Sequence, residues 1–344
     1  MSPSRTNKIC TLLGSGVAIL MFQAAIAAPT IDNVSGSLEH GSSIEITGTG
    51  FGSATPERTQ VWDAVENQPD LMALPDDSVI PTDYGPWTHN GNPWSTPVRI
   101  EKESQGRHSN SKAHHRGVTK SYLGWPANFK DNANRSIYVS WWFKPYGDID
   151  AQGGANKLIR IWDDPNGKHT RISWTQELLG GYGGDASWKG WQGTAHQWNR
   201  LEIYVNSDAG TITTWTNGKI VHHVTDFVKA DYDGGLTIGL VGFDPNYNDR
   251  YEGLRFDFDD IYASESLARV EISDQSEWDS AGNRKELQIP RLWSNDKLEL
   301  TVNLGQFDAS QGLYLYVVND NGEVNQQGYQ ICSKCPSTPE MGIE

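Results

Sequence analysis

Short runs of alternating apolar and polar residues extend along most of the chain, and helical periodicity is almost absent. The runs are rich in Ile, Val, Thr, Tyr and Trp and are bounded by Gly, Asn and Asp, which is the pattern of β-strands joined by turns. Antiparallel strands in this number suit a two-sheet sandwich or jelly roll. The clearest predicted strands cover residues 136–144, 156–162, 170–174, 198–206, 211–216, 219–223, 235–241 and 252–263.

Two connecting segments stand out from this pattern. Asn217-Gly218 separates two predicted strands and favours a type I′ hairpin turn, because Asn and Gly both tolerate positive φ. Residues 64–98 are rich in Pro, Asp, Asn and Gly, so we expect a long loop that crosses one face or rim before a strand at 111–118.

The two ends of the chain carry parts of one pattern. Residues 29–53 read PTIDNVSGSLEHGSSIEITGTGFGS, residues 293–298 read WSNDKL, and residues 315–322 read LYVVNDNG. Together these segments resemble an immunoglobulin-like TIG (IPT) domain. The resemblance implies one split domain, made of residues 28–54 and 268–331, into which residues 55–267 are inserted.

The inserted region carries a second resemblance. Its segments SIYVSWWFKPYGD, NKLIRIWDD, WNRLEIYVN, GTITTWTNGKIVHH and FDFDDIYAS resemble the concanavalin A-like jelly rolls, which include lectins, laminin-G-type modules, glucanases and polysaccharide lyases. The resemblance covers about residues 105–264 and implies a fold but no activity, because this scaffold carries many functions. The expected fold class is therefore all-β, with a concanavalin A-like jelly-roll sandwich in residues 55–267 inserted in a small Ig-like (TIG) β-sandwich.

Residues 1–27 have the features of an export signal. Arg5 and Lys8 precede an apolar stretch at 9–22, and Ala25-Ile26-Ala27 resembles a cleavage site. Because a membrane-spanning helix needs about 20 apolar residues, we expect cleavage and no later membrane insertion, with an uncleaved anchor as the alternative. The expected location is secreted, periplasmic or at the cell surface.

The chain is acidic. Its formal net charge is −15, and removal of Arg5 and Lys8 with the signal makes it −17 (−15 − 2). Nucleic acids and anionic membrane surfaces require clustered Lys and Arg, so the charge argues against both as partners. It also disfavours a highly anionic polysaccharide, unless a local basic groove overrides the global field.

The mature chain keeps two cysteines, Cys332 and Cys335, in a predicted flexible tail of residues 332–344. In an oxidising compartment this Cys-x-x-Cys pair is expected to close as a local disulfide. A redox-active pair is the alternative, although such motifs usually begin a helix.

Tryptophan is concentrated in the inserted region, where twelve of the fourteen lie between residues 62 and 215. Indole rings can fill a sandwich core or stack on the apolar faces of sugar rings. Alternation along the strand places one of Trp141 and Trp142 inward and the other outward.

Residues 180–193, GGYGGDASWKGWQG, contain too many glycines for a packed strand. We therefore expect Tyr182, Trp188 and Trp191 on a loop, where exposed rings indicate ligand contact. Asp185 would add a hydrogen-bonding group beside them.

The segment NKLIRIW predicts a polar and aromatic face on one strand. Alternation places Lys157, Ile159 and Ile161 on one side and Leu158, Arg160 and Trp162 on the other. Concanavalin A-like jelly rolls bind glycans across a concave sheet, so the resemblance implies a sugar site at Arg160 and Trp162. The alternative is a surface arginine paired with a carboxylate.

The sequence contains few motifs that would indicate an enzyme. The Glu-x-Asp-x-x-Glu spacing of laminarinase-type hydrolases does not occur. A polysaccharide lyase would need a cation to neutralise a uronate and a Tyr or His to move the proton. Arg160, Arg171, His169 and Tyr182 could supply these groups, but the motifs of alginate-lyase jelly rolls are absent.

No cofactor is required by the sequence, although a structural calcium is one interpretation of FDFDD. Asp257 and Asp259 would share one face of a strand, with Asp260 opposite, and carboxylate oxygens suit Ca²⁺. The alternative is the polar outer face of a terminal strand. His222 and His223 occupy adjacent strand positions and must face opposite sides.

The preferred function is non-catalytic polysaccharide or cell-surface glycan binding outside the cytoplasm. A structural or adhesive surface protein, in which the TIG-like domain mediates assembly with an envelope protein partner, is one alternative. A polysaccharide lyase acting by β-elimination is the other.

Overall fold

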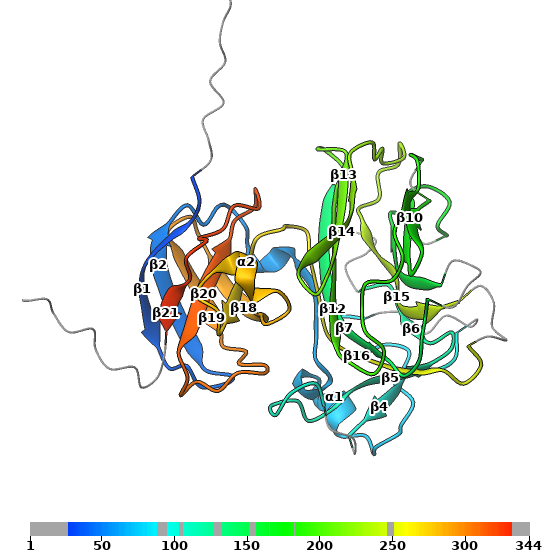
Figure 1. The fold of residues 1–344 in the computed structure, drawn as a ribbon, viewed down its shortest axis with the longest axis horizontal. Helices are drawn as coiled ribbons and strands as arrows, with labels where there is room; N and C mark the ends of the chain where they lie inside the picture. The colour runs from blue at the N-terminus through cyan, green and yellow to red at the C-terminus, as the bar shows by residue number, and fades with distance from the viewer. Residues whose placement is uncertain are drawn as a thin grey trace, which may run out of the picture.

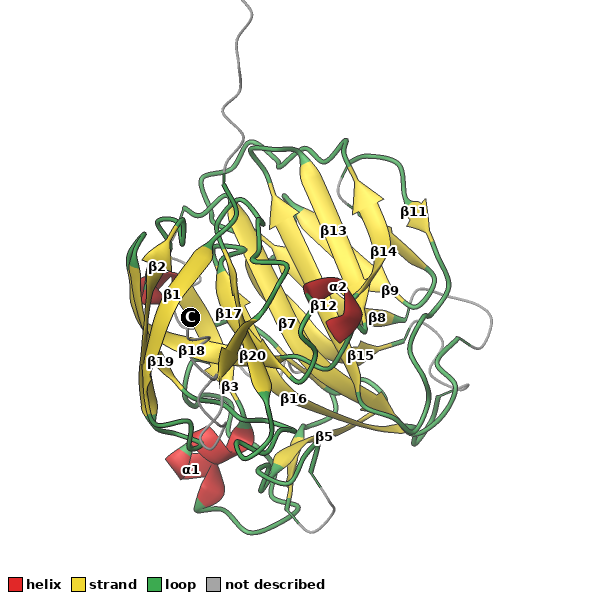
Figure 2. Cartoon of the chain, turned by 60° about the vertical axis from the view of Figure 1, so that its left-hand side comes forward, coloured by secondary structure: helices red, strands yellow, loops and turns green. Residues whose placement is uncertain are grey.

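A computed structural model describes residues 27–87, 95–102, 106–126, 133–150, 156–164, 166–181, 183–245 and 251–331. Helix accounts for 5% and strand for 46%, and the strands form sandwich-like sheets (Figures 1 and 2). The predicted all-β class is therefore confirmed. Within the described ranges, none of the helices has the length and apolar character needed to span a membrane.

The first sheet contains strands from both ends of the chain (Figure 1). We call it the terminal sheet. Its second strand pairs with β19 in antiparallel register, so that Ile46 lies opposite Leu298, and both side chains are fully buried. In spatial order its strands are β1 (Thr30–Gly36), β2 (Ser43–Thr49), β19 (Lys297–Thr301), β18 (Glu286–Trp293), β17 (Arg269–Ser273), β20 (Leu313–Val318) and β21 (Tyr329–Ile331).

The intervening residues build a sandwich of two sheets. The six-stranded sheet consists, in order, of β11 (Ser187–Trp188), β10 (Leu178–Gly180), β9 (Arg171–Thr175), β8 (Lys157–Trp162), β15 (Thr237–Asp244) and β6 (Tyr122–Leu123). The eight-stranded sheet consists of β14 (Lys219–Val224), β13 (Thr211–Thr216), β12 (Asn199–Asn206), β7 (Ser136–Pro145), β16 (Arg255–Ser264), β5 (His114–Val118) and β4 (Arg99–Glu101), and β3 (Thr59–Asp63) also pairs with β16.

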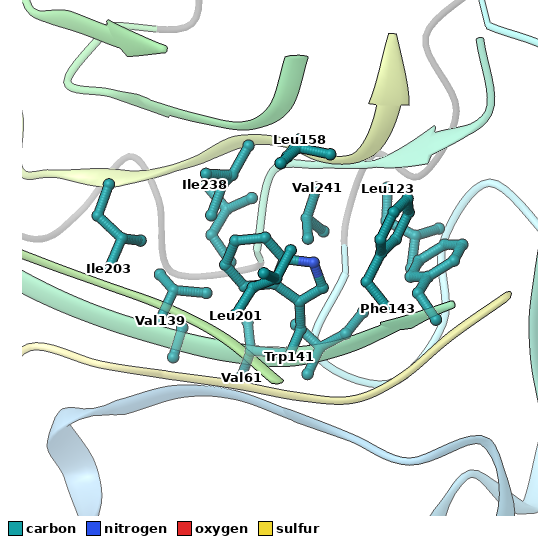
Figure 3. Close-up of a cluster of buried hydrophobic side chains, with 14 of the residues drawn as sticks. Val61, Leu123, Val139, Trp141, Phe143, Leu158, Leu201, Ile203, Ile238 and Val241 are labelled. Atoms are coloured by element: carbon teal, nitrogen blue, oxygen red, sulfur yellow. The ribbon is translucent and has the colours of Figure 1, made fainter. Parts of the chain in front are cut away.

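The core of the sandwich lies between its two sheets (Figure 3). Trp141 and Phe143 on β7 point inward and are fully buried, where Trp141 contacts Trp174 of the other sheet edge-on at 5.8 Å between ring centroids. Trp142 points to the opposite side of β7. The predicted division between Trp141 and Trp142 is thus confirmed, because successive strand residues alternate between faces.

The outer face of the eight-stranded sheet packs against the terminal sheet. Arg200 on β12 donates from Nη1 to Oε2 of Glu271 on β17 at 2.5 Å. Arg107 donates from Nη1 to Oε1 of Glu286 on β18 at 2.7 Å, and its guanidinium lies 4.3 Å from the ring centroid of Trp142. These charged groups are buried and paired, as burial requires.

The two connecting segments that were singled out in the sequence, Asn217-Gly218 and residues 64–98, agree with their predicted structures to different degrees. The Asn217-Gly218 turn is confirmed as a positive-φ hairpin, with φ of 52° and 77°. The described part of residues 64–98 is not a plain surface loop, because it includes η2 (Val65–Asn67) and α1 (Pro69–Met72). Tyr84 and Trp87 in this segment are buried, and each donates a hydrogen bond of 2.8 Å to Oδ2 of Asp63. Two further short helical elements of the described chain are η1 (Pro56–Arg58) and α2 (Trp278–Ala281).

Candidate binding face of the six-stranded sheet

The outer face of the six-stranded sheet is turned away from the terminal sheet (Figure 1). On β8, Ile159 and Ile161 point into the core, whereas Arg160 and Trp162 point outward and are half-buried. This confirms the predicted alternation for these four residues. Leu158 was expected outward but is fully buried in the core, because an irregularity of register follows Lys157.

Trp162 lies flat over the sheet. A Cβ placed on Gly239 of β15 would be 2.3 Å from the Trp162 ring, so a glycine is needed for the ring to approach the strand this closely. The ring of Trp125 is 6.2 Å away between centroids, tilted by 45°. Among the described residues, Nε1 of Trp162 has no hydrogen-bond partner although the atom is buried. A buried donor without a partner in the protein is uncommon. Such a donor usually bonds to water or to a ligand.

Arg160 is held beside the aromatic rings by a polar neighbour. Its Nε donates to Oγ of Ser173, on β9, at 3.1 Å. Burial and the nearby Arg171 lower the pKa of Arg160, but a guanidinium stays charged in proteins. Burial, with the carboxylate of Asp244, raises the pKa of Tyr122 to about 12, so this phenol keeps its proton. The face therefore presents a cation and a hydroxyl donor together.

Trp188 lies on the same face at the edge of the sheet. Cross-strand pairs connect Arg160 with Ser173, Ser173 with Gly180, and Leu178 with Trp188. Paired residues share a face, as do positions two apart on one strand. Three strand spacings of about 4.8 Å put Trp188 roughly 14 Å from Arg160 across the sheet. The ring is 63% exposed.

The strand of Trp188 is fixed from its inner side. Oγ of Ser187 lies 2.9 Å from Nδ1 of His222 on β14. Burial and the nearby Lys189 lower the pKa of His222 to about 4, so this imidazole is neutral at physiological pH. His223 next to it is exposed, and the predicted opposite orientation of the two histidines is confirmed. Ser187 and His222 thus anchor β11 while Trp188 faces solvent.

The glycine-rich segment was predicted as a loop with three exposed rings, and this is partly wrong. Trp188 belongs to the short strand β11, and Trp191 is half-buried. The Trp191 ring packs against the core and contacts Phe143 edge-on at 6.2 Å between ring centroids. Asp185 is exposed, and its backbone N–H donates to Oδ2 of Asp226. Tyr182 lies outside the described residues.

The residues considered for lyase chemistry are only partly brought together. Arg171 is exposed and lies directly opposite Trp162 in the sheet, next to Arg160. His169 lies in the turn between β8 and β9 and stacks on Tyr232 at 4.2 Å between centroids, with planes 8° apart. This stacking occupies one face of the imidazole.

The pair considered for calcium, Asp257 and Asp259, lies on β16. Asp257 accepts hydrogen bonds from Tyr146 at 2.8 Å and from Arg255 at 3.0 Å, which uses both carboxylate oxygens. In the described part of the chain, no group of three or more His, Cys, Asp or Glu side chains is placed to hold a metal ion.

The expected orientation of Asp260, opposite Asp259, is wrong. The register of β16 against β7 shifts between Asp259 and Tyr262, and Asp260 has a φ of 47°. Its carboxylate turns to the interface with the terminal sheet and pairs with Arg107. A bulge of this kind re-aims side chains that simple alternation would place elsewhere. Cys332 and Cys335, the predicted disulfide, lie outside the described residues.

Sequence reasoning missed Tyr122, Trp125 and Ser173 on the binding face. The first two belong to or follow β6, a strand of two residues, which is too short to show alternation. Ser173 carries no chemical signal by itself. Only the register between strands shows that these residues surround Arg160 and Trp162.

No protein-family model matches the sequence, and no curated protein matches it. Among solved structures, the chain is similar to the cellulose-induced protein Cip1, with 18% identity, 49% of this chain and 85% of that chain covered, and a TM-score of 0.34. It is also similar to domain 4 of AbnA, an extracellular GH43 arabinanase from Geobacillus stearothermophilus solved with arabinotriose (18% identity, 49% and 82% covered, TM-score 0.32).

A third similar structure is the endo-β-1,4-glucuronan lyase of the fungus Trichoderma reesei, with 15% identity, 48% of this chain and 89% of that chain covered, and a TM-score of 0.31. At these identities and TM-scores, the likenesses assign no function to the chain.

Proposed function

We propose that the protein binds a polysaccharide, without catalysis, through the outer face of its six-stranded sheet, and that it does so at the cell surface or outside the cell. The observation that carries the proposal is the 63% exposure of Trp188 on the face that also holds Arg160 and Trp162. A large exposed ring on an otherwise well-packed protein marks a contact surface.

The chemistry of the face suits sugars. Flat indole rings present apolar area with a defined orientation, which matches the apolar side of a pyranose ring. Arg160, Tyr122 and Ser173 offer hydrogen-bonding groups beside Trp162. The distance of roughly 14 Å from Arg160 to Trp188 spans more than one sugar unit, so a chain is a better occupant than a monosaccharide.

Affinity electrophoresis in gels that contain soluble polysaccharides tests the proposal. Wild-type protein should be retarded by at least one neutral or weakly acidic polysaccharide, and Trp188→Ala and Arg160→Ala should each weaken the retardation about fivefold or more. Ile220→Ala is the matched control, because Ile220 is 64% exposed but lies on β14 of the other sheet.

Two results would contradict this function. One is that no polysaccharide in a broad panel, including glucans, xylans, arabinans and pectins, retards the wild-type protein. The other is that Trp188→Ala and Ile220→Ala have the same effect on retardation. Circular dichroism of each variant checks that the comparison is made between folded proteins.

A further inference from the structure

Three arginines meet around a second site, at the edge of the eight-stranded sheet. Arg99 on β4 lies opposite Arg116 on β5, and Arg255 on β16 lies opposite Val118. These side chains line a cavity of about 320 Å³ together with Pro97 and Gly117. The strands β4 and β5 lie away from the terminal sheet (Figure 1), so the terminal sheet does not cover this pocket.

Asp77 and Glu101 hold the three guanidinium groups in place. Arg99 donates from Nη1 to the backbone carbonyl of Asp77 at 2.6 Å, and Arg116 pairs with Asp77 and, at 3.5 Å, with Glu101. Arg255 lies 3.2 Å from Glu101. A guanidinium group that is fixed in this way loses little side-chain entropy when it binds a further anion.

Asp257 is a second carboxylate that contacts Arg255. Its Oδ1 accepts from Nε of Arg255 at 3.0 Å, and its Oδ2 accepts from the hydroxyl of Tyr146 at 2.8 Å. Burial opposes ionisation, but the contact of Oδ2 with Nε2 of His114 at 3.3 Å and the hydrogen bond from Arg255 hold the pKa of Asp257 below its usual value. Burial, together with the bond to Asp257, raises the pKa of Tyr146 to about 12. The carboxylate is therefore charged and the phenol neutral across the physiological range.

The arginines keep hydrogen-bonding capacity that these carboxylates do not use. A guanidinium has five N–H donors. Among the described residues, Nε and Nη2 of Arg99 and Nη1 of Arg255 have no acceptor. The Arg99 and Arg255 side chains are 41% and 31% exposed. Free donors on partly exposed guanidinium groups around one cavity are suited to an incoming anion.

The local charge is opposite in sign to that of the whole protein. Three arginines balance the three carboxylates of Asp77, Glu101 and Asp257, and Lys144, which lies 4.8 Å above the Tyr146 ring, adds a fourth cation. The chain as a whole has a net charge of −15. The negative field of the whole protein repels anions. An anion would therefore bind this basic site through direct contacts with its guanidinium groups.

We propose that this pocket binds a compact organic carboxylate of monosaccharide size, such as a uronic acid. Planar guanidinium groups match a carboxylate in two-point hydrogen bonding, and a cavity of about 320 Å³ is at the small end of ligand pockets. The site lies on a different sheet from Arg160 and Trp188 and does not depend on the polysaccharide-binding proposal.

Isothermal titration with sodium galacturonate tests the site, with the galacturonate methyl ester as a neutral ligand of the same shape. The wild-type protein should bind the acid about tenfold or more tightly than the ester, and Arg99→Gln should remove most of this difference. Arg135→Gln is the control variant, because Arg135 is also a partly exposed arginine paired with one aspartate, outside the pocket.

Arg255→Gln should have the larger effect on binding, but it also leaves Glu101 and Asp257 with fewer partners. Thermal unfolding therefore accompanies each titration, and Arg99→Gln decides the question if Arg255→Gln does not fold. Absence of galacturonate binding, equal binding of acid and ester, or unchanged affinity in Arg99→Gln would overturn the proposal. Inorganic phosphate binding as tightly as galacturonate would overturn the choice of a carboxylate.

Polysaccharide retardation of Arg99→Gln separates the two sites. If both proposals hold, Arg99→Gln loses galacturonate binding and keeps retardation, whereas Trp188→Ala keeps galacturonate binding and loses retardation.

Discussion

The two sheets of the sandwich present a tryptophan and an arginine on their outer faces, with different consequences. On the eight-stranded sheet, Trp142 and Arg200 are 6% and 1% exposed because the terminal sheet covers them. On the six-stranded sheet, Trp162 and Arg160 stay half-buried. The same residue types therefore form an interface on one side of the sandwich and a candidate binding face on the other.

The partners of the two arginines explain the difference. Arg200 contacts the carboxylates of Glu271 and Glu202, at 2.5 and 3.3 Å, so its charge is compensated inside the protein. Arg160 donates to the neutral hydroxyl of Ser173. An arginine in direct ion pairs with buried carboxylates stabilises a buried interface, whereas one without a direct ion pair is available to a ligand.

The largest expected effect is on the covered side. Arg200→Met should lower the free energy of unfolding by about 3–5 kcal/mol, because it leaves Glu271 buried without its main partner. Arg135→Met, which removes an exposed pair with Asp208, should cost less than about 1 kcal/mol. Urea denaturation of both variants measures the difference. Equal losses would show that the interface does not depend on this pair.

Trp142→Ala should destabilise the protein by about 3 kcal/mol, since it removes a buried ring and its contact with Arg107. Trp188→Ala should change the free energy of unfolding by less than about 0.5 kcal/mol, because the ring is on the surface. Both values come from the same denaturation series. A larger loss for Trp188→Ala than for Trp142→Ala would reverse the assignment of covered and open faces.

The contribution of the covered side to the free energy of unfolding should also depend on pH. Burial, with the nearby Asp260 carboxylate, raises the pKa of Glu66 to about 7. The folded state then binds more protons than the unfolded state between the two pKa values, so stability falls as pH rises from about 4.5 to 7. The loss attributable to Glu66 is on the order of 3 kcal/mol.

Urea denaturation of wild type and Glu66→Gln at pH 5 and pH 7.5 measures this contribution together with that of Asp259, whose raised pKa depends in part on the Glu66 charge. Glu66→Gln should lose less stability over the interval than wild type. The exposed Glu39→Gln variant should keep the wild-type dependence, and a Glu66→Gln curve parallel to wild type would contradict the prediction.

A small stability change is also expected for the arginine on the open side. Arg160→Ala should alter the free energy of unfolding by less than about 1 kcal/mol, since only one neutral hydrogen bond is lost. Its effect should appear in polysaccharide retardation instead. A stability loss comparable to that of Arg200→Met would mean that Arg160 is a structural residue.

Much of the sandwich could be predicted from local pattern. The predicted strand at 211–216 coincides with β13, and the strand at 198–206 differs from β12 by one residue. Long strands such as these show several cycles of alternation. The strands β6 and β11 have two residues each, which gives no cycle to recognise.

The candidate site was predictable only in part. Arg160 and Trp162 follow from alternation on one strand, and Trp188 was singled out by its glycine-rich surroundings. Trp191, three positions later, packs on Phe143 instead, and nothing in the local sequence distinguishes the two rings. The arginine pocket was not predicted, because Arg99 and Arg255 are 156 positions apart (255 − 99) and meet through strand order.

The sequence by itself determined where the long strands lie and, away from the register irregularities at Leu158 and Asp260, which of their side chains point inward, because alternation is a property of each strand alone. The tertiary structure alone decided which outward residues are covered. Arg200 is buried because Glu271, on a strand of the terminal sheet, packs against it, while no carboxylate contact accompanies the Ser173 bond of Arg160 among the described hydrogen bonds. Coverage depends on segments far apart along the chain, and a local pattern carries no information about their packing.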